Sequence, residues 1–313
     1  MQICSLLPSA TEILYALGLG DSVVGVTHEC DFPPEAAKKP ALIRPRVDPH
    51  AQPAEIDRRV NELVARGQGI YAVDADLLAS LAPDLIVTQD LCHVCAASPD
   101  DLAVALSRLT KQPEVVTLTP HSLADVWGDI CRVGASTAKS HDAQALAGRL
   151  AARVAEINAV ARNAVTRPRV VCLEWLDPFY IAGHWVPEMV AKAGGEDVLG
   201  RAGEPSFRAS AEDIAQTRAE IILVMPCGYN AARAVTEFES MRLPEIWSEL
   251  PAVQEQRIFA VDASSYFSRP GPRLTTGVEI SAHLFHPELF PAGFPVGAFQ
   301  RLSQRTWSSY GSR

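Results

Sequence analysis

Residues 139–165, KSHDAQALAGRLAARVAEINAVARNAV, form the longest helical pattern in the chain. One stripe of apolar residues runs along this pattern with spacings of four, four, three, four and four: Leu146, Leu150, Val154, Ile157, Ala161 and Val165. At 1.5 Å per residue the helix would be about 40 Å long, which is more than one small lobe needs. The stretch therefore predicts a rigid connector between two lobes, which ends before Pro168.

Strand and helix patterns alternate on both sides of this stretch. Strands are predicted at 23–27, 84–88 and 114–118 before it, and at 169–174, 220–225 and 257–261 after it. Helices are predicted at 53–66, 75–81, 99–110 and 122–136, and the capping-box pair Ser9 and Glu12 predicts another that Gly18 or Gly20 ends. Such alternation indicates α/β layers. We expect an N-terminal lobe over 1–121, a helical connector over 122–167 and a C-terminal lobe over 168–313.

A short internal similarity suggests that the two lobes are built alike. Residues 74–87 and 210–223 both place a capping residue, an acid two positions later and then a buried strand at the same offset. The acids are Asp76 and Glu212. Acids in the first turn of a helix are stabilised by the helix dipole, which is one explanation for them. The alternative is that they form two equivalent contacts for a two-fold symmetric partner.

Composition and charge exclude several classes of function. The 313 residues carry 28 basic and 37 acidic side chains, a net charge of −9, with no basic cluster, so we expect neither nucleic-acid nor membrane-surface binding. No apolar run is long enough to cross a membrane. The N-terminus has no signal-peptide pattern, and the seven cysteines form no disulfide framework. We therefore expect a cytoplasmic monomer, or a periplasmic or surface-anchored one if the chain is a trimmed mature form.

Aromatic and polar residues gather directly after the predicted strands, where open α/β sheets bind ligands. These clusters lie at 28–32, 89–95, 174–180, 226–230 and 264–269. Loops of this composition that face each other would suit a large, flat, partly apolar ligand. Within 89–95, Cys92 and Cys95 form a C-x-x-C pair that is typical of half a zinc site or of a redox pair. His28 and Cys30 would complete a zinc site only if the two loops meet.

The sequence offers no sign of catalysis. It has no G-x-S-x-G, no H-E-x-x-H, no phosphate-binding loop and no G-x-G-x-x-G, and its eight histidines are scattered. We therefore predict that the protein is not an enzyme and holds no resident metal or cofactor.

Several motifs resemble the class III, helical-backbone substrate-binding proteins, in particular the cobalamin-binding branch that serves vitamin B12 ABC importers. The resemblance covers nearly the whole chain and rests on SLLPSATE at 5–12, VGVTHECDFPPEA at 24–36, LAPDLIV at 81–87, AGGEDV at 193–198, the unit at 210–224 and PGPR at 270–273. Within it, CDFPP at 30–34 is similar to the cobalamin branch more than to siderophore or haem binders.

The resemblance implies two Rossmann-like lobes joined by one long helix, with the ligand in the cleft between them. The positions that match the family's ligand loops are His28, Asp31, Phe32, Trp175, Phe179, Tyr180, Trp185, Tyr266, Phe267 and Arg269. In the family one acid of each lobe docks onto an ABC permease dimer, and Asp76 and Glu212 match those acids. The bound molecule is then cobalamin or a related corrinoid. For His28 and His184 we favour a hydrogen bond to a corrin amide over ligation of cobalt.

Two features depart from the family pattern. The chain lacks the export signal of members that feed importers, and 45–71 is longer than the matching segment, with an added helix at 53–66. Two alternative functions therefore stay open, a haem or ferric-siderophore binder and a metal or redox protein that uses Cys92 and Cys95.

Overall fold

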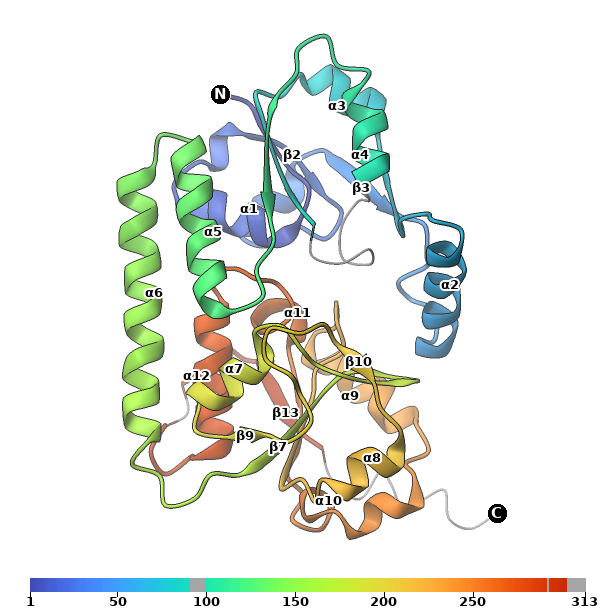
Figure 1. Ribbon diagram of the computed structural model, residues 1–313, viewed down its shortest axis with the longest axis vertical. Helices are drawn as coiled ribbons and strands as arrows, with labels where there is room; N and C mark the ends of the chain where they lie inside the picture. Colours follow the sequence, from blue (N-terminus) through green and yellow to red (C-terminus); the bar gives the residue numbers. More distant parts are fainter. Residues whose placement is uncertain (91–98, 292, 303–313) are drawn as a thin grey trace. The chain divides into compact units, whose positions relative to one another are not determined.

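The computed structural model describes residues 1–90, 99–291 and 293–302, which fold into two compact units (Figure 1). The N-lobe comprises Met1–Pro120 and Ala124–Arg149, and the C-lobe comprises His121–Leu123 and Leu150–Arg313. The division falls inside helix α6 (Ser140–Ala161), so both lobes share the segment predicted as a connector. The fold is α/β in two lobes, as the alternation of strands and helices predicts.

The described residues of the N-lobe form a six-stranded sheet in the order β4-β3-β2-β1-β5-β6. Its strands are β1 (Ile3–Ser5), β2 (Val23–Thr27), β3 (Ala41–Pro45), β4 (Tyr71–Val73), β5 (Leu85–Gln89) and β6 (Glu114–Leu118). All neighbours pair in parallel except β3 and β4. The order of the chain reverses at β1, which has β2 on one side and β5 on the other. Ligands of open α/β sheets bind beyond the carboxyl ends of the strands at such a point.

Helices complete the N-lobe. They are α1 (Pro8–Ala16), α2 (Pro53–Ala65), α3 (Ala75–Leu81), α4 (Pro99–Leu106) and α5 (Leu123–Ser136), with α6 shared between the lobes. One apolar core joins strand residues such as Ile86 to Leu78 of α3 and Leu102 of α4. The predicted helix at 75–81 and strand at 114–118 are confirmed, whereas α4 ends at Leu106, four residues before the predicted end.

The capping box predicted at Ser9 and Glu12 is wrong. Helix α1 begins at Pro8 with Leu7 as its N-cap, and both Ser9 and Glu12 are buried inside the helix. Proline at the first helical position has its φ preset and no amide that needs a partner, so the helix begins there without a side-chain cap. The predicted stop is confirmed, because Gly18 follows the helix with φ of 73°.

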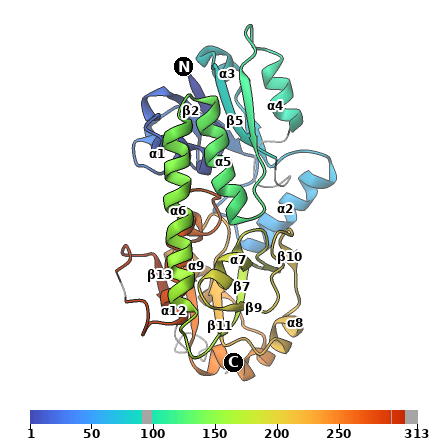
Figure 2. The ribbon, with the colours of Figure 1, turned by 60° about the vertical axis from the view of Figure 1, so that its left-hand side comes forward.

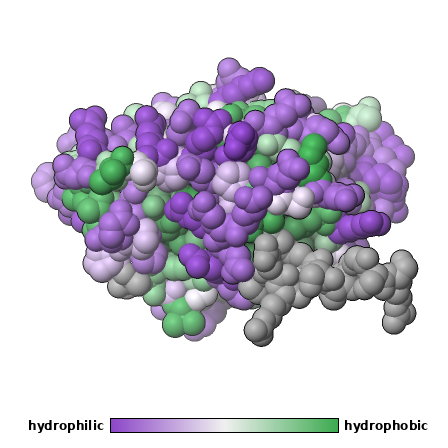
Figure 3. All heavy atoms as spheres, turned by 90° about the horizontal axis from the view of Figure 1, so that it is seen from below, coloured by the Kyte–Doolittle hydropathy of each residue, from purple (hydrophilic) through white to green (hydrophobic). Residues whose placement is uncertain are grey.

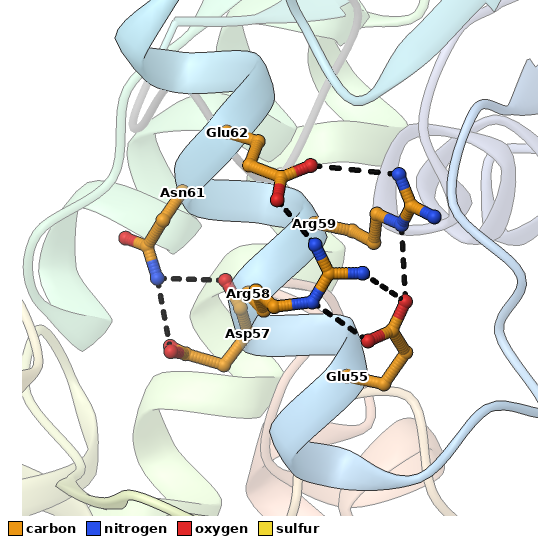
Figure 4. Close-up of polar contacts among 6 residues, drawn as sticks. All are labelled: Glu55, Asp57, Arg58, Arg59, Asn61 and Glu62. Atoms are coloured by element: carbon orange, nitrogen blue, oxygen red, sulfur yellow. Dashed lines mark hydrogen bonds and ion pairs between the residues drawn. The ribbon is translucent and has the colours of Figure 1, made fainter.

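Helix α2 belongs to the long segment between β3 and β4, as the pattern at 53–66 predicts. On its exposed side, Arg58 and Arg59 each pair with both Glu55 and Glu62 (Figure 4). Such pairs, spaced three and four residues apart, stabilise a helix by about 0.2–0.5 kcal/mol each. Pro53 is the only buried residue of α2, so this helix gains little from burial in the core. The four ion pairs on its surface therefore contribute to its stability.

Helix α6 confirms the apolar stripe over most of its length. Val154, Ile157 and Ala161 are buried, but the helix ends at Ala161, and Val165 is fully exposed beyond it. Figure 2 shows α6 as one continuous helix beside α5. The two helices approach closely in the N-lobe, since a Cβ on Gly134 would lie 2.3 Å from the Cβ of Ala143.

The described residues of the C-lobe form a seven-stranded sheet in the order β10-β8-β7-β11-β12-β13, with β9 also paired to β7. Its strands are β7 (Arg169–Leu176), β8 (Phe179–Ile181), β9 (Glu196–Asp197), β10 (Phe207–Arg208), β11 (Ile221–Val224), β12 (Ile258–Val261) and β13 (Phe299–Arg301). Strands β9, β7, β11 and β12 run parallel, and the other pairings are antiparallel. The three strands predicted for this lobe, at 169–174, 220–225 and 257–261, are confirmed as β7, β11 and β12.

Short helices cover the C-lobe sheet. They are α7 (Val186–Lys192), α8 (Ala211–Gln216), α9 (Ala231–Ser240), α10 (Pro251–Gln254), α11 (Ala263–Tyr266) and α12 (Leu274–Phe285), with a 3₁₀ turn at Glu245–Glu249. Trp247 and Phe238 are the largest side chains buried in the C-lobe core, beside Ile222 of β11. All residues of this core belong to the C-lobe.

The two sheets share a central pattern of parallel strands. In the N-lobe β1 lies between β2 and β5, and in the C-lobe β7 pairs in parallel with β9 and β11. An acid before the next strand bonds to the start of the central strand in both lobes: Asp84 Oδ2 accepts from the Gln2 amide, and Glu220 Oε2 accepts from the Arg169 amide, each at 2.8 Å. The internal similarity at 74–87 and 210–223 thus corresponds to one repeated local arrangement.

The surface seen from below is mixed in character. Figure 3 shows hydrophilic side chains interspersed with smaller hydrophobic groups on that face. Over residues 1–90, 99–291 and 293–302, the model contains no helix with the length and apolar character of a membrane span.

Candidate functional site

The loop after β2 carries the predicted ligand residues of the N-lobe. Asp31 and Phe32 are exposed, and Phe32 leaves 43% of its surface accessible. Parallel strands end at the same edge of a sheet, so this loop lies at the carboxyl edge on which β1, β3 and β5 also end. An exposed phenyl ring at that edge gives an apolar ligand a surface that would be buried on binding.

The imidazole of His28 is held by the neighbouring strands. Its Nδ1 lies 3.0 Å from the carbonyl oxygen of Ile43 in β3, and its ring centroid lies 5.8 Å from that of Tyr71 in β4. Its Nε2 lies 3.8 Å from Glu29 Oε1, and about a quarter of the side chain is exposed. His28 therefore offers a partly exposed Nε2 in a fixed position.

A buried polar cluster anchors this loop from beneath. Cys30 Sγ lies 3.1 Å from Thr11 Oγ1 and 3.2 Å from Thr27 Oγ1, and Thr11 Oγ1 donates to Ser5 Oγ at 2.8 Å. The thiol is 3% exposed, so Cys30 positions the chain two residues before Phe32 and is closed to solvent. Sequence reasoning missed this role, although Ser5, Thr11, Thr27 and Cys30 all lie within the motifs quoted for the resemblance.

Three of the predicted aromatic residues of the C-lobe lie at the end of β7 and in β8. The Trp175 ring packs edge-on against Tyr229 at 5.5 Å, and Phe179 stacks on Trp247 at 4.9 Å. All three predicted residues here, Trp175, Phe179 and Tyr180, are partly exposed. Trp175 and Phe179 therefore pack against buried core residues and still keep part of their aromatic surface accessible.

Arginines accompany the aromatic residues of the C-lobe, which the sequence pattern did not reveal. The Arg233 guanidinium lies 3.7 Å from the Tyr229 ring centroid and donates to the Tyr229 hydroxyl at 2.9 Å. Arg208 Nε donates to the Tyr180 hydroxyl at 2.8 Å. Such cation–π and hydrogen-bonded pairs hold both partners in place and bring positive charge beside the aromatic surface.

Trp185 and Phe267 are buried in the C-lobe and bonded to each other. The Trp185 indole donates to the Phe267 carbonyl oxygen at 2.7 Å, and the two residues are 5% and 1% exposed. Their neighbours Tyr266 and Arg269 are partly exposed. Trp185 and Phe267 thus fix the segment that presents Tyr266 and Arg269, and have little surface of their own to offer a ligand.

A partly buried acid, Glu174, lies directly before Trp175 and was not singled out by its sequence position. Burial raises the pKa of its carboxyl group, and hydrogen bonds from Ser206 and from the Gly183 backbone oppose that shift. The same contacts join β7 to the 183 and 206 segments. Only glycine at position 183 lets the backbone there lie so close to the backbone at 204, because a Cβ on Gly183 would lie 2.3 Å from the Glu204 carbonyl oxygen.

The acids Asp76 and Glu212 occupy equivalent positions in the two lobes. Each lies in the first turn of its helix, α3 or α8, and each is exposed. The caps of both helices are formed, since Asp74 Oδ1 accepts from the Leu77 amide and Ser210 Oγ from the Asp213 amide, each at 3.0 Å. Asp76 is 92% exposed and lies 3.0 Å from Arg108 Nη1. Both carboxylates are accessible to a partner.

The C-x-x-C pair, Cys92 and Cys95, lies outside the described residues. Among residues 1–90, 99–291 and 293–302, no group of three or more His, Cys, Asp or Glu side chains is arranged to hold a metal ion. Cys4 and Cys172 are fully buried, and burial raises the pKa of both thiols, that of Cys4 to about 12. These two thiols are poor metal ligands or nucleophiles, because the thiolate is the reactive form.

Comparison with known proteins identifies the family. A sequence model described as "Periplasmic binding protein" matches residues 3–264. The chain belongs to the periplasmic binding protein family. This confirms the resemblance to class III substrate-binding proteins of ABC importers. Periplasmic binding proteins are solute carriers without enzymatic activity, so the prediction that the chain is not an enzyme is also confirmed. Such proteins carry a ligand, which is not an intrinsic cofactor.

Two relatives match along most of the chain. An uncharacterized ABC transporter substrate-binding lipoprotein, YvrC, of Bacillus subtilis is 28% identical, over 92% of this chain and 81% of its own. The vitamin B12-binding protein of Vibrio cholerae is 25% identical, over 89% of this chain and 86% of its own. The predicted cytoplasmic location finds no support in a family described as periplasmic or in a relative named as a lipoprotein.

Solved structures of this family agree with the two-lobed fold. A periplasmic haem-binding protein of Pseudomonas aeruginosa superposes with a TM-score of 0.73 at 17% identity, over 96% of this chain and 98% of its own. At that identity the likeness concerns the fold alone. A periplasmic vitamin B12 binding protein of Vibrio cholerae superposes with a TM-score of 0.68 at 21% identity, over 91% of this chain and 96% of its own. Solved proteins named for vitamin B12 and for haem therefore share this architecture, and the fold does not choose between the two ligands.

Proposed function

We propose that this periplasmic binding protein carries a corrinoid, cobalamin or a close relative, to an ABC importer. The observation that carries the proposal is the 25% identity over 89% of the chain to a protein named as vitamin B12-binding. Partly exposed aromatic side chains at Phe32, Trp175 and Tyr180 support it, because a corrin ring has broad apolar faces. The ligand is expected to contact these residues together with His28, Asp31, Phe179, Tyr266 and Arg269.

Haem is the second candidate, and a specific observation favours it. Arg208 lies against Tyr180, and Arg233 lies against Tyr229 and pairs with Glu237, so both bring guanidinium groups to the aromatic residues of the C-lobe. Haem carries two carboxylates that such guanidinium groups bind well. Sequence similarity to a vitamin B12-binding protein supports the corrinoid. The positive charge of the arginines beside Tyr180 and Tyr229 supports haem.

Parallel titrations with hydroxocobalamin and with haemin decide between the two ligands. Heat release and the visible spectrum are followed together on purified, cooperatively folded protein. The proposal expects saturable one-to-one binding of hydroxocobalamin and at least about tenfold weaker binding of haemin, a difference of about 1.4 kcal/mol. Tighter binding of haemin would replace the corrinoid by haem, and binding of neither would reject both.

Replacing Phe32 by alanine is expected to weaken corrinoid binding about 10- to 100-fold. Burial of a phenylalanine side chain contributes about 1.5–3 kcal/mol, and 1.4 kcal/mol corresponds to tenfold. Val104→Ala is the matched control, since Val104 is 61% exposed on α4 of the same lobe. Calorimetric titration of both variants measures the effect. Equal affinities for Phe32→Ala and the control would remove Phe32 from the site.

We further propose that Asp76 and Glu212 dock the loaded protein onto the permease. Their equivalent positions and exposure support two similar contacts with a symmetric dimer. Changing both to lysine is expected to abolish binding to permease in detergent or nanodiscs while leaving ligand affinity unchanged. Glu204→Lys, at another exposed acid, is the control and should bind permease normally. Retained docking by the double variant would contradict the assignment.

The relatives also support a location outside the cytoplasm, which cell fractionation of the native host tests directly. Recovery with a periplasmic or membrane-anchored marker is expected. Recovery with a cytoplasmic marker would contradict the transport role.

A further inference from the structure

Two histidines of the C-lobe, His121 and His184, lie side by side. His121 belongs to the segment His121–Leu123, and His184 lies directly before Trp185 and α7. Their ring centroids are 5.9 Å apart and their planes are inclined by 37°. They come from positions 63 residues apart in sequence, so the fold of the C-lobe brings them together.

The backbone fixes His184 in place. Its amide donates to the Glu204 carbonyl oxygen at 2.6 Å, and its carbonyl oxygen accepts from the Gly203 amide at 2.9 Å. Its φ is 51°, in the left-handed region that few residues other than glycine adopt. The ring therefore has a set position, packed 5.6 Å from the Trp185 ring.

One ring nitrogen of His184 lacks a partner within the described part of the chain. Its Nε2 is buried and makes no hydrogen bond there. A buried polar atom without a partner destabilises the fold, and a bound ion is one way in which such an atom is satisfied. The hydroxyl oxygens of Ser9, Tyr15 and Thr275 are also buried without a hydrogen-bond partner among the described residues. An imidazole nitrogen differs from them because it is a strong ligand for transition metals.

The surroundings of the pair also suit a metal. Burial and, to a smaller extent, the nearby His121 lower the pKa of His184, which disfavours the protonated ring. Glu188, one turn into α7, accepts a hydrogen bond from the Leu123 amide at 2.9 Å and lies 3.9 Å from Lys192 Nζ. This acid ties segment His121–Leu123 to α7 and adds negative charge near the two imidazoles.

We propose that His121 and His184 form a two-imidazole site for a divalent transition-metal ion such as Ni²⁺, Cu²⁺ or Zn²⁺. Metal–nitrogen bonds of 2.0–2.1 Å place the centroids of two imidazoles on one ion roughly 5–6 Å apart, which agrees with the observed separation. Water supplies the remaining ligands. The ion would link segment His121–Leu123 to the residue that precedes Trp185. The proposal rests on the two imidazoles alone and does not depend on the proposed function.

Titration of the full chain with NiCl₂ tests the site. Cys92→Ser and Cys95→Ser are introduced first, so that the C-x-x-C pair contributes no binding. The proposal expects one ion per chain, and at least about tenfold weaker binding in His121→Ala and in His184→Asn. Asparagine tolerates a positive φ, so it keeps the backbone of residue 184 while removing the imidazole. His141→Ala, at a histidine whose side chain is 97% exposed, is the control and should bind normally.

A spectroscopic measurement separates this site from scattered binding to surface histidines. Electron paramagnetic resonance of the Cu²⁺ complex should show coupling to two imidazole nitrogens in the chain without the C-x-x-C pair and to fewer in either variant. Unchanged Ni²⁺ affinity in His184→Asn, with a cooperative thermal melt, would overturn the proposal. An equal loss of affinity in His141→Ala would overturn it as well, because it would show that any histidine serves.

Discussion

Replacement of Gly277 by alanine is expected to destabilise the protein by about 3 kcal/mol or more. Gly277 lies in α12, and a Cβ there would be 2.1 Å from the Tyr266 carbonyl oxygen and 2.6 Å from the Met189 side chain. The carbonyl oxygen belongs to the backbone and cannot turn aside as a flexible side chain would. Helix α12 must therefore move away from the segment that contains Tyr266 and Phe267.

Gly128→Ala is the matched control for this substitution. Gly128 lies within α5, and nothing would approach its Cβ within 4 Å. Alanine favours a helix interior over glycine by about 0.5–1 kcal/mol, so this variant should be slightly more stable than the parent. Urea unfolding followed by circular dichroism measures both variants. Similar stability for Gly277→Ala and Gly128→Ala would show that α12 accommodates a methyl group freely.

Asp129→Asn is expected to stabilise the protein at pH 8, by roughly 1–2 kcal/mol, because asparagine removes a buried charge but also weakens the contact with Arg132. The Asp129 side chain is 3% exposed, and its Oδ2 has no partner among the described residues. Burial raises its pKa from 3.8 to about 6, although Arg132, 2.6 Å from Oδ1, opposes the shift. Each unit of pKa corresponds to 1.36 kcal/mol, so the difference of 6 − 3.8 sets an upper limit of about 3 kcal/mol.

The sign of this effect gives it a distinctive pH dependence. A carboxyl group with a raised pKa binds its proton more tightly in the folded state, so its contribution to stability is full below pH 3.8 and is lost as the pH rises through about 6. The advantage of Asp129→Asn should therefore be largest above pH 7 and vanish near pH 4. Asp142→Asn, at an exposed acid of α6, is the control and should change little. An advantage that does not vary between pH 4 and pH 8 would contradict the assignment.

Patterns of local origin were predictable from the sequence. The stripe in α6, the limits of α3 and β6, and strands β2, β5, β7, β11 and β12 depend on residues close together in the chain, through helical periodicity and strand composition. The antiparallel strands β4, β8, β10 and β13 were not predicted. They contain two or three residues each, too few to produce a pattern, and they form only because a neighbouring strand offers a free edge.

The candidate site likewise combines features that the sequence predicts with features that it does not predict. Its loops were predictable because ligand residues follow parallel strands, and the exposure of Phe32 agrees with that expectation. The roles of individual side chains were not predictable. Trp185 and Phe267 are aromatic and match the family's ligand loops, as the accessible residues do. In the structure, however, both are buried, and the Trp185 indole bonds to the Phe267 carbonyl oxygen.

By itself, the sequence determined the α/β class, the two-lobed organisation, the long helix and the family, because periodicity and short motifs encode them locally. The tertiary structure alone decided which aromatic residues keep exposed surface, which acids are buried, and that His121 and His184 become neighbours. Those properties arise from packing between segments distant in the chain, where contacts exclude water and set burial and charge, and no local pattern records them.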